Sequence, residues 1–166
     1  MQTEVTIYTD GSSRGNPGPG GYGAVLLCPP YRKEISCGYR LTTNNRMELL
    51  AVIAALEALR RPCSVTVYSD SQYVVNAVQK GWLESWMRKN FAGKKNADLW
   101  RRYAEAAKTH RVKMVWIKGH ADTPEHERCD RMAVAAAEGK CLETDAGYET
   151  EMQTALMPGS HNPEVE

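Results

Sequence analysis

The stretches VTIYTDGS (residues 5–12) and VTVYSDSQ (residues 65–72) decide the fold, because they are near copies of one strand pattern. Each alternates side chains between two faces and ends on an aspartate, Asp10 or Asp70. If the two strands lie parallel and adjacent, both aspartates emerge at the edge where open α/β sheets bind ligands. Carboxylates this close repel unless a proton or cation separates them, and Mg²⁺ prefers oxygen ligands. The matched strands therefore predict a divalent-metal site.

The same carboxylates also have ordinary structural explanations. Asp10 precedes a glycine, which is a common turn dipeptide, and Asp70 precedes a predicted helix, which is a common N-cap position. Glu48 would occupy the third helical position of a capping box with Asn45 at the N-cap. Asp130 lies between two arginines in a predicted helix, where an exposed ion pair is the ordinary outcome. The matched strands favour a site for Asp10 and Asp70, whereas spacing alone leaves Glu48 and Asp130 open.

The remaining pattern predicts a five-stranded mixed sheet, with three antiparallel and two parallel strands and helices on both faces. This is an α/β domain with the order β-β-β-α-β-α-α-β-α, expected over residues 1–142. The acidic tail over residues 143–166 has few bulky apolar residues and is expected to be largely disordered. The predicted strands are 4–9, 22–28, 34–41, 64–69 and 112–117, and the predicted helices are 44–60, 71–80, 97–109 and 124–138.

Composition places the chain among ordinary globular proteins. Its 166 residues suit one domain, and no apolar stretch approaches the ~18 residues of a membrane span. The N-terminus has no basic and apolar leader pattern, and five cysteines at irregular spacings indicate reduced thiols. A cytoplasmic protein without membrane contact is expected.

The net charge of +1 hides a strongly basic segment at residues 80–118, which holds eleven of the 21 Lys and Arg against three acidic residues. Such a segment is often only a solvated helix face. Here aromatic residues interleave with the cations, which also suits a nucleic-acid track of phosphate contacts and stacked rings. These aromatic residues are Trp82, Trp86, Phe91, Trp100 and Tyr103.

The chain resembles bacterial type I ribonuclease H. The blocks IYTDGSSRGNPGPGGYGAVL, TTNNRMELLAVIAALEAL, YSDSQYV and WIKGHADTPEHERCDRMA occur in that family's order and approximate spacing, from near residue 5 to about 138. GYETE, near 147–151, is similar to the family's C-terminal end. The resemblance implies a ribonuclease H-like fold and hydrolysis of the RNA strand of RNA–DNA hybrids, leaving 5′-phosphate and 3′-hydroxyl ends.

The resemblance also implies residue roles. Asp10, Glu48, Asp70 and Asp130 would hold two Mg²⁺ ions during phosphodiester hydrolysis, for which Mn²⁺ can substitute. His120 would assist proton transfer or product release. His126 is instead expected to have a structural role on a helix surface. Substrate contacts, largely independent of base sequence, are implied for Ser13, Asn16, Thr43, Asn44, Asn45, Gln72, Trp82 and Asn96.

The chain departs from the family pattern in its basic protrusion, MRKNFAGKKNADLW, which is several residues shorter than in well-known bacterial members. Phe91 also stands where a tryptophan is expected, which puts hybrid affinity in question but not the chemistry. Three alternatives are another nuclease of the same fold, a non-catalytic hybrid-binding module and a structural domain with an acidic sheet edge. The combined blocks, the four retained carboxylates and the basic segment favour the ribonuclease, expected to be a monomer.

Overall fold

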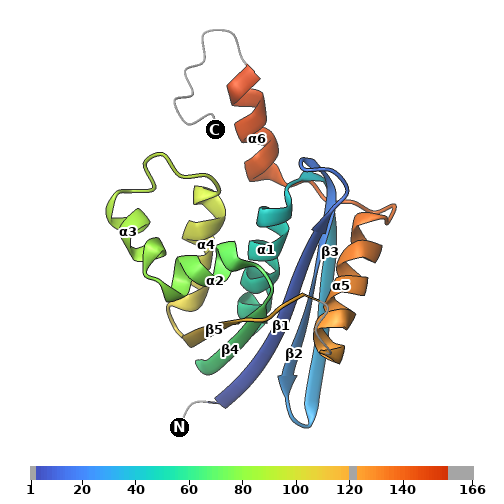
Figure 1. The fold of residues 1–166 in the computed structure, drawn as a ribbon, viewed down its shortest axis with the longest axis vertical. Helices are drawn as coiled ribbons and strands as arrows, with labels where there is room; N and C mark the ends of the chain where they lie inside the picture. Colours follow the sequence, from blue (N-terminus) through green and yellow to red (C-terminus); the bar gives the residue numbers. More distant parts are fainter. Residues whose placement is uncertain (1–2, 120–122, 157–166) are drawn as a thin grey trace.

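The structure, a computed structural model, describes residues 3–119 and 123–156. Five strands form one sheet in the order β3-β2-β1-β4-β5, in which β1–β2 and β2–β3 are antiparallel and β1–β4 and β4–β5 are parallel (Figure 1). The predicted mixed sheet is therefore confirmed. The strands are β1 (Thr3–Ser13), β2 (Gly18–Cys28), β3 (Tyr31–Thr42), β4 (Cys63–Ser69) and β5 (Arg111–Trp116).

Six helices accompany this sheet in the described part of the chain. They are α1 (Asn44–Glu57), α2 (Gln72–Gln79), α3 (Trp82–Arg88), α4 (Ala97–Ala107), α5 (Pro124–Ala137) and α6 (Ala146–Leu156). Two of them, α3 and α6, are additional to the predicted order. None of the helices in residues 3–119 and 123–156 is long and apolar enough to cross a membrane.

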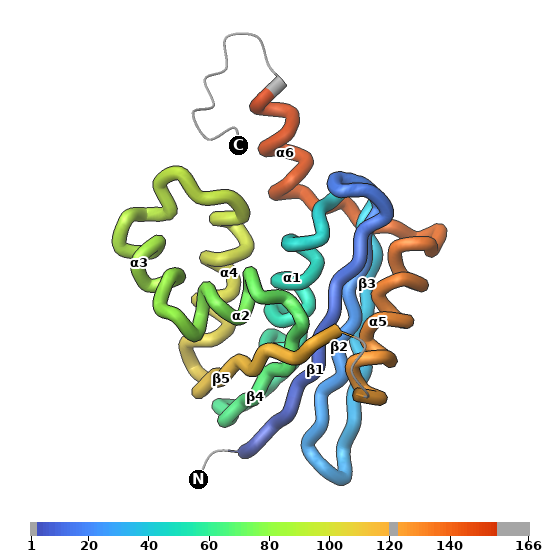
Figure 2. Tube along the Cα trace, viewed as in Figure 1, coloured from blue at the N-terminus to red at the C-terminus, as the bar shows by residue number. Residues whose placement is uncertain are grey.

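Helices α1 and α5 pack on opposite faces of the sheet, as the tube in Figure 2 shows. Strand alternation explains this, since neighbouring residues of β2 point to opposite faces. A Cβ on Gly20 would meet Met47 of α1, and a Cβ on Gly21 would collide with Ala133 of α5. The glycine at position 21 thus allows α5 to approach the sheet closely. The main core lies between the sheet and α1 and extends to α2 and α4.

The described part of the C-terminal tail contains the helix α6, which the sequence pattern did not predict. Glu143 bridges to Tyr39 of β3, and the following helix α6 stands beside the end of α1 (Figure 1). Arg40 donates two hydrogen bonds to the Glu149 carboxylate, at 2.8 and 2.9 Å. Sequence composition did not predict this helix because it is placed by contacts with β3 rather than by its own apolar content. Residues 157–166 lie outside the described residues.

Candidate active site

The parallel pairing of β1 and β4 brings Asp10 and Asp70 together. Tyr8 and Tyr68 are direct register partners with rings stacked 4.9 Å apart, and each aspartate follows two residues later. Asp10 lies inside β1 opposite Gly23, so it is not part of a turn. Ser71, rather than Asp70, caps α2 by accepting a hydrogen bond from the backbone N–H of Val74. The two structural explanations for these aspartates therefore do not hold.

Glu48 reaches the same place from α1. The N-cap of α1 is Thr43, whose hydroxyl accepts a hydrogen bond from the Arg46 N–H, so the predicted capping box with Asn45 at the N-cap is wrong. The backbone of Gly11 lies directly against α1, because a Cβ there would collide with the backbone nitrogen of Glu48. This close approach of β1 and α1 leaves Glu48 only 5% exposed beside Asp10.

Helix α5 contributes Asp130 and His126 from the other face of the sheet. Arg128, one of the two arginines flanking Asp130, instead donates to the carboxylate of Glu34 on β3. Asp130 lies close enough to Asp10 to help raise its pKa. Contrary to the predicted surface position, His126 is 2% exposed, and its Nε2 lies 3.8 Å from Asp10 Oδ2 and 3.7 Å from Asp70 Oδ2.

The spacing of His126 and Asp130 contains a signal that sequence reasoning did not use. Residues four apart share one helix face, so an α5 that directs Asp130 toward the sheet edge also directs His126 there. The other histidine, His120, which the family resemblance places in the active site, lies outside the described residues.

The electrostatics of this cluster are unfavourable for carboxylates alone. Burial, reinforced by Asp70 and Asp130, raises the pKa of Asp10 to about 8. Burial and the charges of Asp10 and Asp70 also raise the pKa of Glu48 well above its ordinary value. Within the described residues, the buried oxygens Glu48 Oε1 and Asp70 Oδ1 accept no hydrogen bond. A hard divalent cation fits this set of donors, because it neutralises the repulsion and takes oxygen ligands.

Three of the predicted substrate contacts gather at the N-terminus of α1. Asn16, in the turn between β1 and β2, accepts a hydrogen bond from the Asn44 backbone N–H at 3.0 Å, and Thr43 is the adjacent N-cap. Ser13 ends β1 at the start of the same turn, and Gln72 is exposed at the start of α2. The β1–β2 turn, the α1 N-terminus and the α2 N-terminus thus present polar side chains next to the carboxylate cluster.

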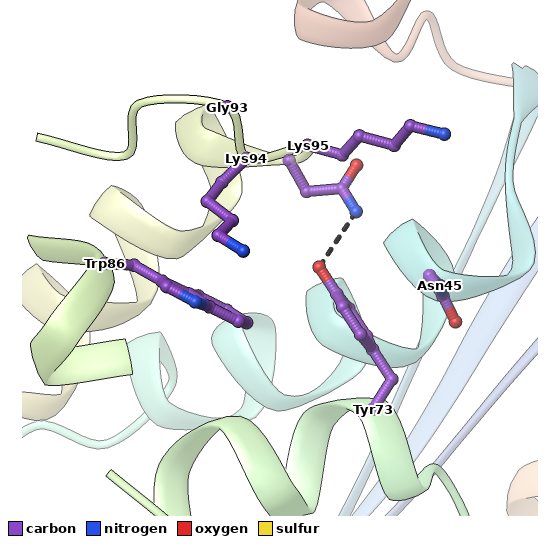
Figure 3. Close-up of a pocket in the computed structure, with 7 residues that line it drawn as sticks. Asn45, Tyr73, Trp86, Gly93, Lys94 and Lys95 are labelled. Atoms are coloured by element: carbon purple, nitrogen blue, oxygen red, sulfur yellow. Dashed lines mark hydrogen bonds between the residues drawn. The ribbon is translucent and has the colours of Figure 1, made fainter. Parts of the chain in front are cut away.

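A pocket beside this polar group is lined by Asn45, Tyr73, Trp86, Gly93, Lys94, Lys95 and Asn96 (Figure 3). The Tyr73 hydroxyl accepts hydrogen bonds from Asn96 Nδ2 at 3.0 Å and from Trp100 Nε1 at 2.8 Å. Lys94 Nζ lies 5.3 Å from the centre of the Trp86 ring, which orients its charge over the indole. The Lys94 ammonium therefore points into this pocket beside the Tyr73 hydroxyl and the Asn96 amide, and such a cation suits a phosphate (Figure 3).

The aromatic residues of the basic segment divide into two groups. Trp82, at the start of α3, is 42% exposed with Lys80 Nζ 5.6 Å from its ring centre. Phe91, Trp100 and Tyr103 are buried, so these three rings are not available for the stacking on nucleic acid that the sequence pattern suggested. Trp100 and Tyr103 belong to α4, and their burial is explained by packing of α4 against α1, which sequence composition does not reveal.

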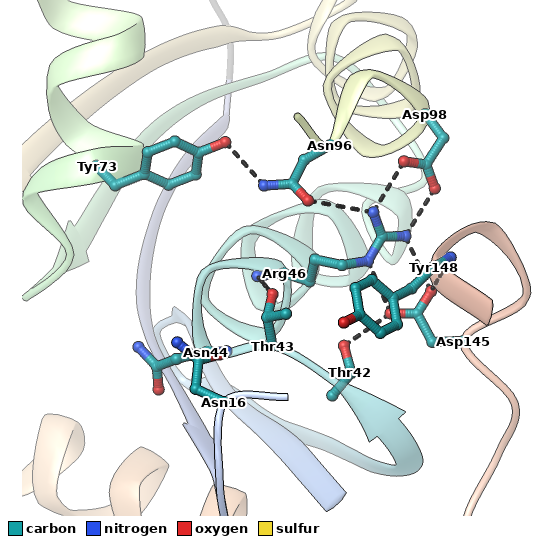
Figure 4. Close-up of polar contacts among 10 residues, drawn as sticks. All are labelled: Asn16, Thr42, Thr43, Asn44, Arg46, Tyr73, Asn96, Asp98, Asp145 and Tyr148. Carbon is teal, nitrogen blue, oxygen red and sulfur yellow. Dashed lines mark hydrogen bonds and ion pairs between the residues drawn. The ribbon is translucent and has the colours of Figure 1, made fainter. Parts of the chain in front are cut away.

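Arg46 is a further residue that sequence reasoning missed, and it is completely buried. Its guanidinium donates to both oxygens of Asp145 and of Asp98 and to Asn96 Oδ1, so it joins α1, α4 and the segment before α6 (Figure 4). Thr42 donates to the same Asp145 carboxylate at 2.7 Å. The signal was an arginine three residues before Leu49, on the apolar face of α1. The network fixes Asn96 at the edge of the pocket.

The mixed sheet, with an acidic cluster formed where Asp10 in β1 meets Asp70 just after β4, is accompanied by a family match that places the chain among the nucleases of the hydrolase class. The chain belongs to the ribonuclease H family, since the family model for RNase H matches residues 2–138. This confirms the family identified from the sequence blocks.

Curated relatives named ribonuclease H support the same family. The protein from Syntrophus aciditrophicus (strain SB) is 55% identical over 152 residues, covering 89% of this chain and 88% of that protein. The protein from Desulforamulus reducens is 54% identical over 147 residues, covering 86% and 92%. The protein from Pectobacterium atrosepticum is 51% identical over 156 residues, covering 91% and 100%.

Solved structures share the fold. The crystal structure of LC9-RNase H1, described as a type 1 RNase H with the type 2 active-site motif, matches with a TM-score of 0.77 and 27% identity, covering 100% of this chain and 87% of that one. LC11-RNase H1 in complex with an RNA/DNA hybrid matches with a TM-score of 0.61 and 26% identity, covering 81% and 96%.

Proposed function

We propose that this ribonuclease H hydrolyses the RNA strand of RNA–DNA hybrids at the cluster of Asp10, Glu48, Asp70 and Asp130, leaving 5′-phosphate and 3′-hydroxyl ends. The observation that carries the proposal is the group of mutually repelling carboxylates beside β1 and β4, in which Asp10 and Glu48 are buried and in which Glu48 Oε1 and Asp70 Oδ1 lack donors among the described residues. The neighbour LC11-RNase H1, in complex with an RNA/DNA hybrid, supports the substrate class.

The four carboxylates would hold two Mg²⁺ ions, for which Mn²⁺ can substitute. When bound, such ions supply Lewis-acid stabilisation of the charge that develops as water attacks a phosphodiester and the 3′ oxygen leaves. The register of β1 and β4 fixes the positions of the Asp10 and Asp70 carboxylates, and Glu48 adds a third carboxylate from α1. His120 is proposed to assist proton transfer or product release at this centre.

Hybrid selectivity requires that one strand be recognised by its 2′-hydroxyls and the other accepted as DNA. We assign the RNA side to Asn16, Asn44, Asn45 and Gln72, because side-chain amides both donate to and accept from a hydroxyl. Ser13, at the end of β1, lies on the same side. Thr43 and Asn96 are assigned to a DNA phosphate, and exposed Trp82 with Lys80 to the DNA backbone. Because these contacts do not address base edges, cleavage is expected to be largely independent of sequence.

The proposal also covers the cell compartment and the assembly state. All five cysteines are free thiols, and Cys63 and Cys129 are buried, which suits a reducing compartment. We propose on this ground that the enzyme is cytoplasmic, and we propose in addition that it acts as a monomer without a membrane partner.

The test is cleavage of a labelled RNA–DNA hybrid in Mg²⁺, beside single-stranded RNA, duplex RNA and duplex DNA. The hybrid alone should be cut, and product analysis should find 5′-phosphate and 3′-hydroxyl ends. Asp70→Asn should lose at least about 10³-fold in rate, because it weakens metal binding without changing side-chain size. Glu105→Gln, which removes an exposed carboxylate paired only with Lys108 in the described residues, is the matched control. Equal cutting of all four substrates, or an active Asp70→Asn, would refute the proposal.

A further inference from the structure

His126 is buried where a helix-surface histidine was expected. It lies in the first turn of α5, is 2% exposed and directs Nε2 between Asp10 and Asp70. The distances of 3.8 and 3.7 Å to the two Oδ2 atoms exceed the 2.7–3.2 Å range of N–H···O hydrogen bonds. At these separations Nε2 lies within ion-pair distance of both carboxylates, and one cation shared by the three groups would produce the same spacing.

We propose that His126 Nε2 is a direct ligand, together with Asp10 and Asp70, of a divalent cation in this centre. The inference rests on the proposed function, since it concerns the same site, and it adds a nitrogen donor to the four carboxylates. Ligand atoms about 2.1 Å from one ion lie roughly 3.0–4.2 Å apart, depending on the angle between them. The two distances from Nε2 fall inside that interval, and all three donor atoms lie within 4.8 Å of one another.

A second observation points to a ligand at this position. The Glu48 side chain is 5% exposed, and its buried Oε1 accepts no hydrogen bond within the described residues, although it adjoins Asp10 and Asp70. A cation bound between these carboxylates would supply the missing partner for this atom. The cluster is therefore a mixed nitrogen and oxygen donor set rather than an isolated group of acidic side chains.

The nitrogen donor has a consequence for metal preference. Mg²⁺ favours an all-oxygen environment, whereas first-row transition metals accept imidazole readily. Manganese shares the carboxylate ligands of magnesium and also tolerates nitrogen. His126 should accordingly raise the affinity for Mn²⁺ relative to Mg²⁺, and this sets the protein apart from a centre made of carboxylates alone.

The decisive experiment is pulsed EPR of the full chain with one equivalent of Mn²⁺. A ¹⁴N coupling from a bound imidazole is expected, and it should change to a ¹⁵N pattern in protein made with ¹⁵N-histidine. The chain has four histidines, so a triple variant with Gln at His110, His120 and His161 leaves His126 as the one remaining imidazole. The coupling should persist in that variant and disappear in His126→Gln.

A missing ¹⁴N coupling in the unaltered protein, or its loss in the triple variant, overturns the inference. The triple variant keeps the test decisive even if His126→Gln fails to fold. Calorimetry adds a second measurement, in which His126→Gln should weaken Mn²⁺ about tenfold and Mg²⁺ by less than about threefold. If His126→Gln instead binds both Mn²⁺ and Mg²⁺ more tightly, His126 acts as a cation that competes with the metal, and the inference is also overturned.

Failure of this inference is distinguishable from failure of the proposed function. Intact hybrid cleavage without nitrogen coupling removes His126 from the metal centre but leaves the ribonuclease assignment standing. Nitrogen coupling without hybrid cleavage would keep His126 as a metal ligand and would remove the assignment of hybrid cleavage.

Discussion

The carboxylate centre should destabilise the metal-free protein in a pH-dependent way, and Asp10→Asn should relieve that cost. In the folded chain, burial and the neighbouring carboxylates raise the pKa of Asp10 to about 8, against about 3.9 in an unfolded chain. Between these values the folded state keeps a proton that the unfolded state has lost. The stability contributed by Asp10 is therefore fully present below about pH 4 and is lost as the pH rises toward 8.

The magnitude follows from the slope of about 1.4 kcal/mol per pH unit for one proton. From pH 5 to pH 7 the largest possible loss is about 3 kcal/mol, and coupling to Glu48 and Asp70 shares the proton among several groups. We expect the free energy of unfolding of Asp10→Asn, minus that of the unaltered protein, to grow by about 1–3 kcal/mol over this interval.

The measurement is urea unfolding followed by circular dichroism, in EDTA, at pH 5, 6 and 7. Glu105→Gln is the control, because its carboxylate is exposed and should show no such growth. Saturating Mg²⁺ should shrink or reverse the difference, since the ion stabilises the carboxylates of the unaltered protein. A difference that stays constant from pH 5 to pH 7 in EDTA would refute the electrostatic argument.

Three further predictions test the surroundings of the site. Asp145→Ala should destabilise the fold by about 3 kcal/mol and lower Tm by roughly 6–12 °C, because it removes a buried partner of the buried Arg46 guanidinium. Asp98→Ala should lower Tm less in the same calorimetric scan, because the Asp98 carboxylate is 44% exposed. The double variant Lys94→Ala, Lys95→Ala should weaken hybrid binding. The slope of the logarithm of the binding constant against the logarithm of salt concentration should fall in magnitude by up to about 2, and an unchanged slope would exclude phosphate contact by these lysines. Gly11→Ala should destabilise by at least about 2 kcal/mol and reduce cleavage, because a Cβ there overlaps the α1 backbone; near-normal stability and cleavage would contradict that packing.

The matched strands and their aspartates could be predicted from sequence because their information is local. The alternation over 5–12 and 65–72 specifies two similar strands, and the intervening helix makes a parallel pairing the natural connection. The parallel register of Tyr8 with Tyr68 then brings Asp10 and Asp70 together.

Helix boundaries were less predictable, and the errors had consequences for the site. The N-cap of α1 is Thr43 rather than Asn45, which removes the capping explanation for Glu48. Asn45, Thr43 and their neighbours are all acceptable N-cap residues, so local chemistry does not choose among them. The choice depends on where β3 ends and how α1 packs on the sheet.

The sequence by itself determined the class of fold, the two strand-end aspartates and, through its characteristic blocks, the family. Only the tertiary structure decided that Glu48 and His126 turn inward, that Arg46 is a buried junction and that the tail forms a helix. The physical reason is that each of these depends on the approach of a helix to a distant segment. The glycines that permit α1 and α5 to contact the sheet, and the carboxylates that neutralise Arg46, lie far along the chain from the residues they position.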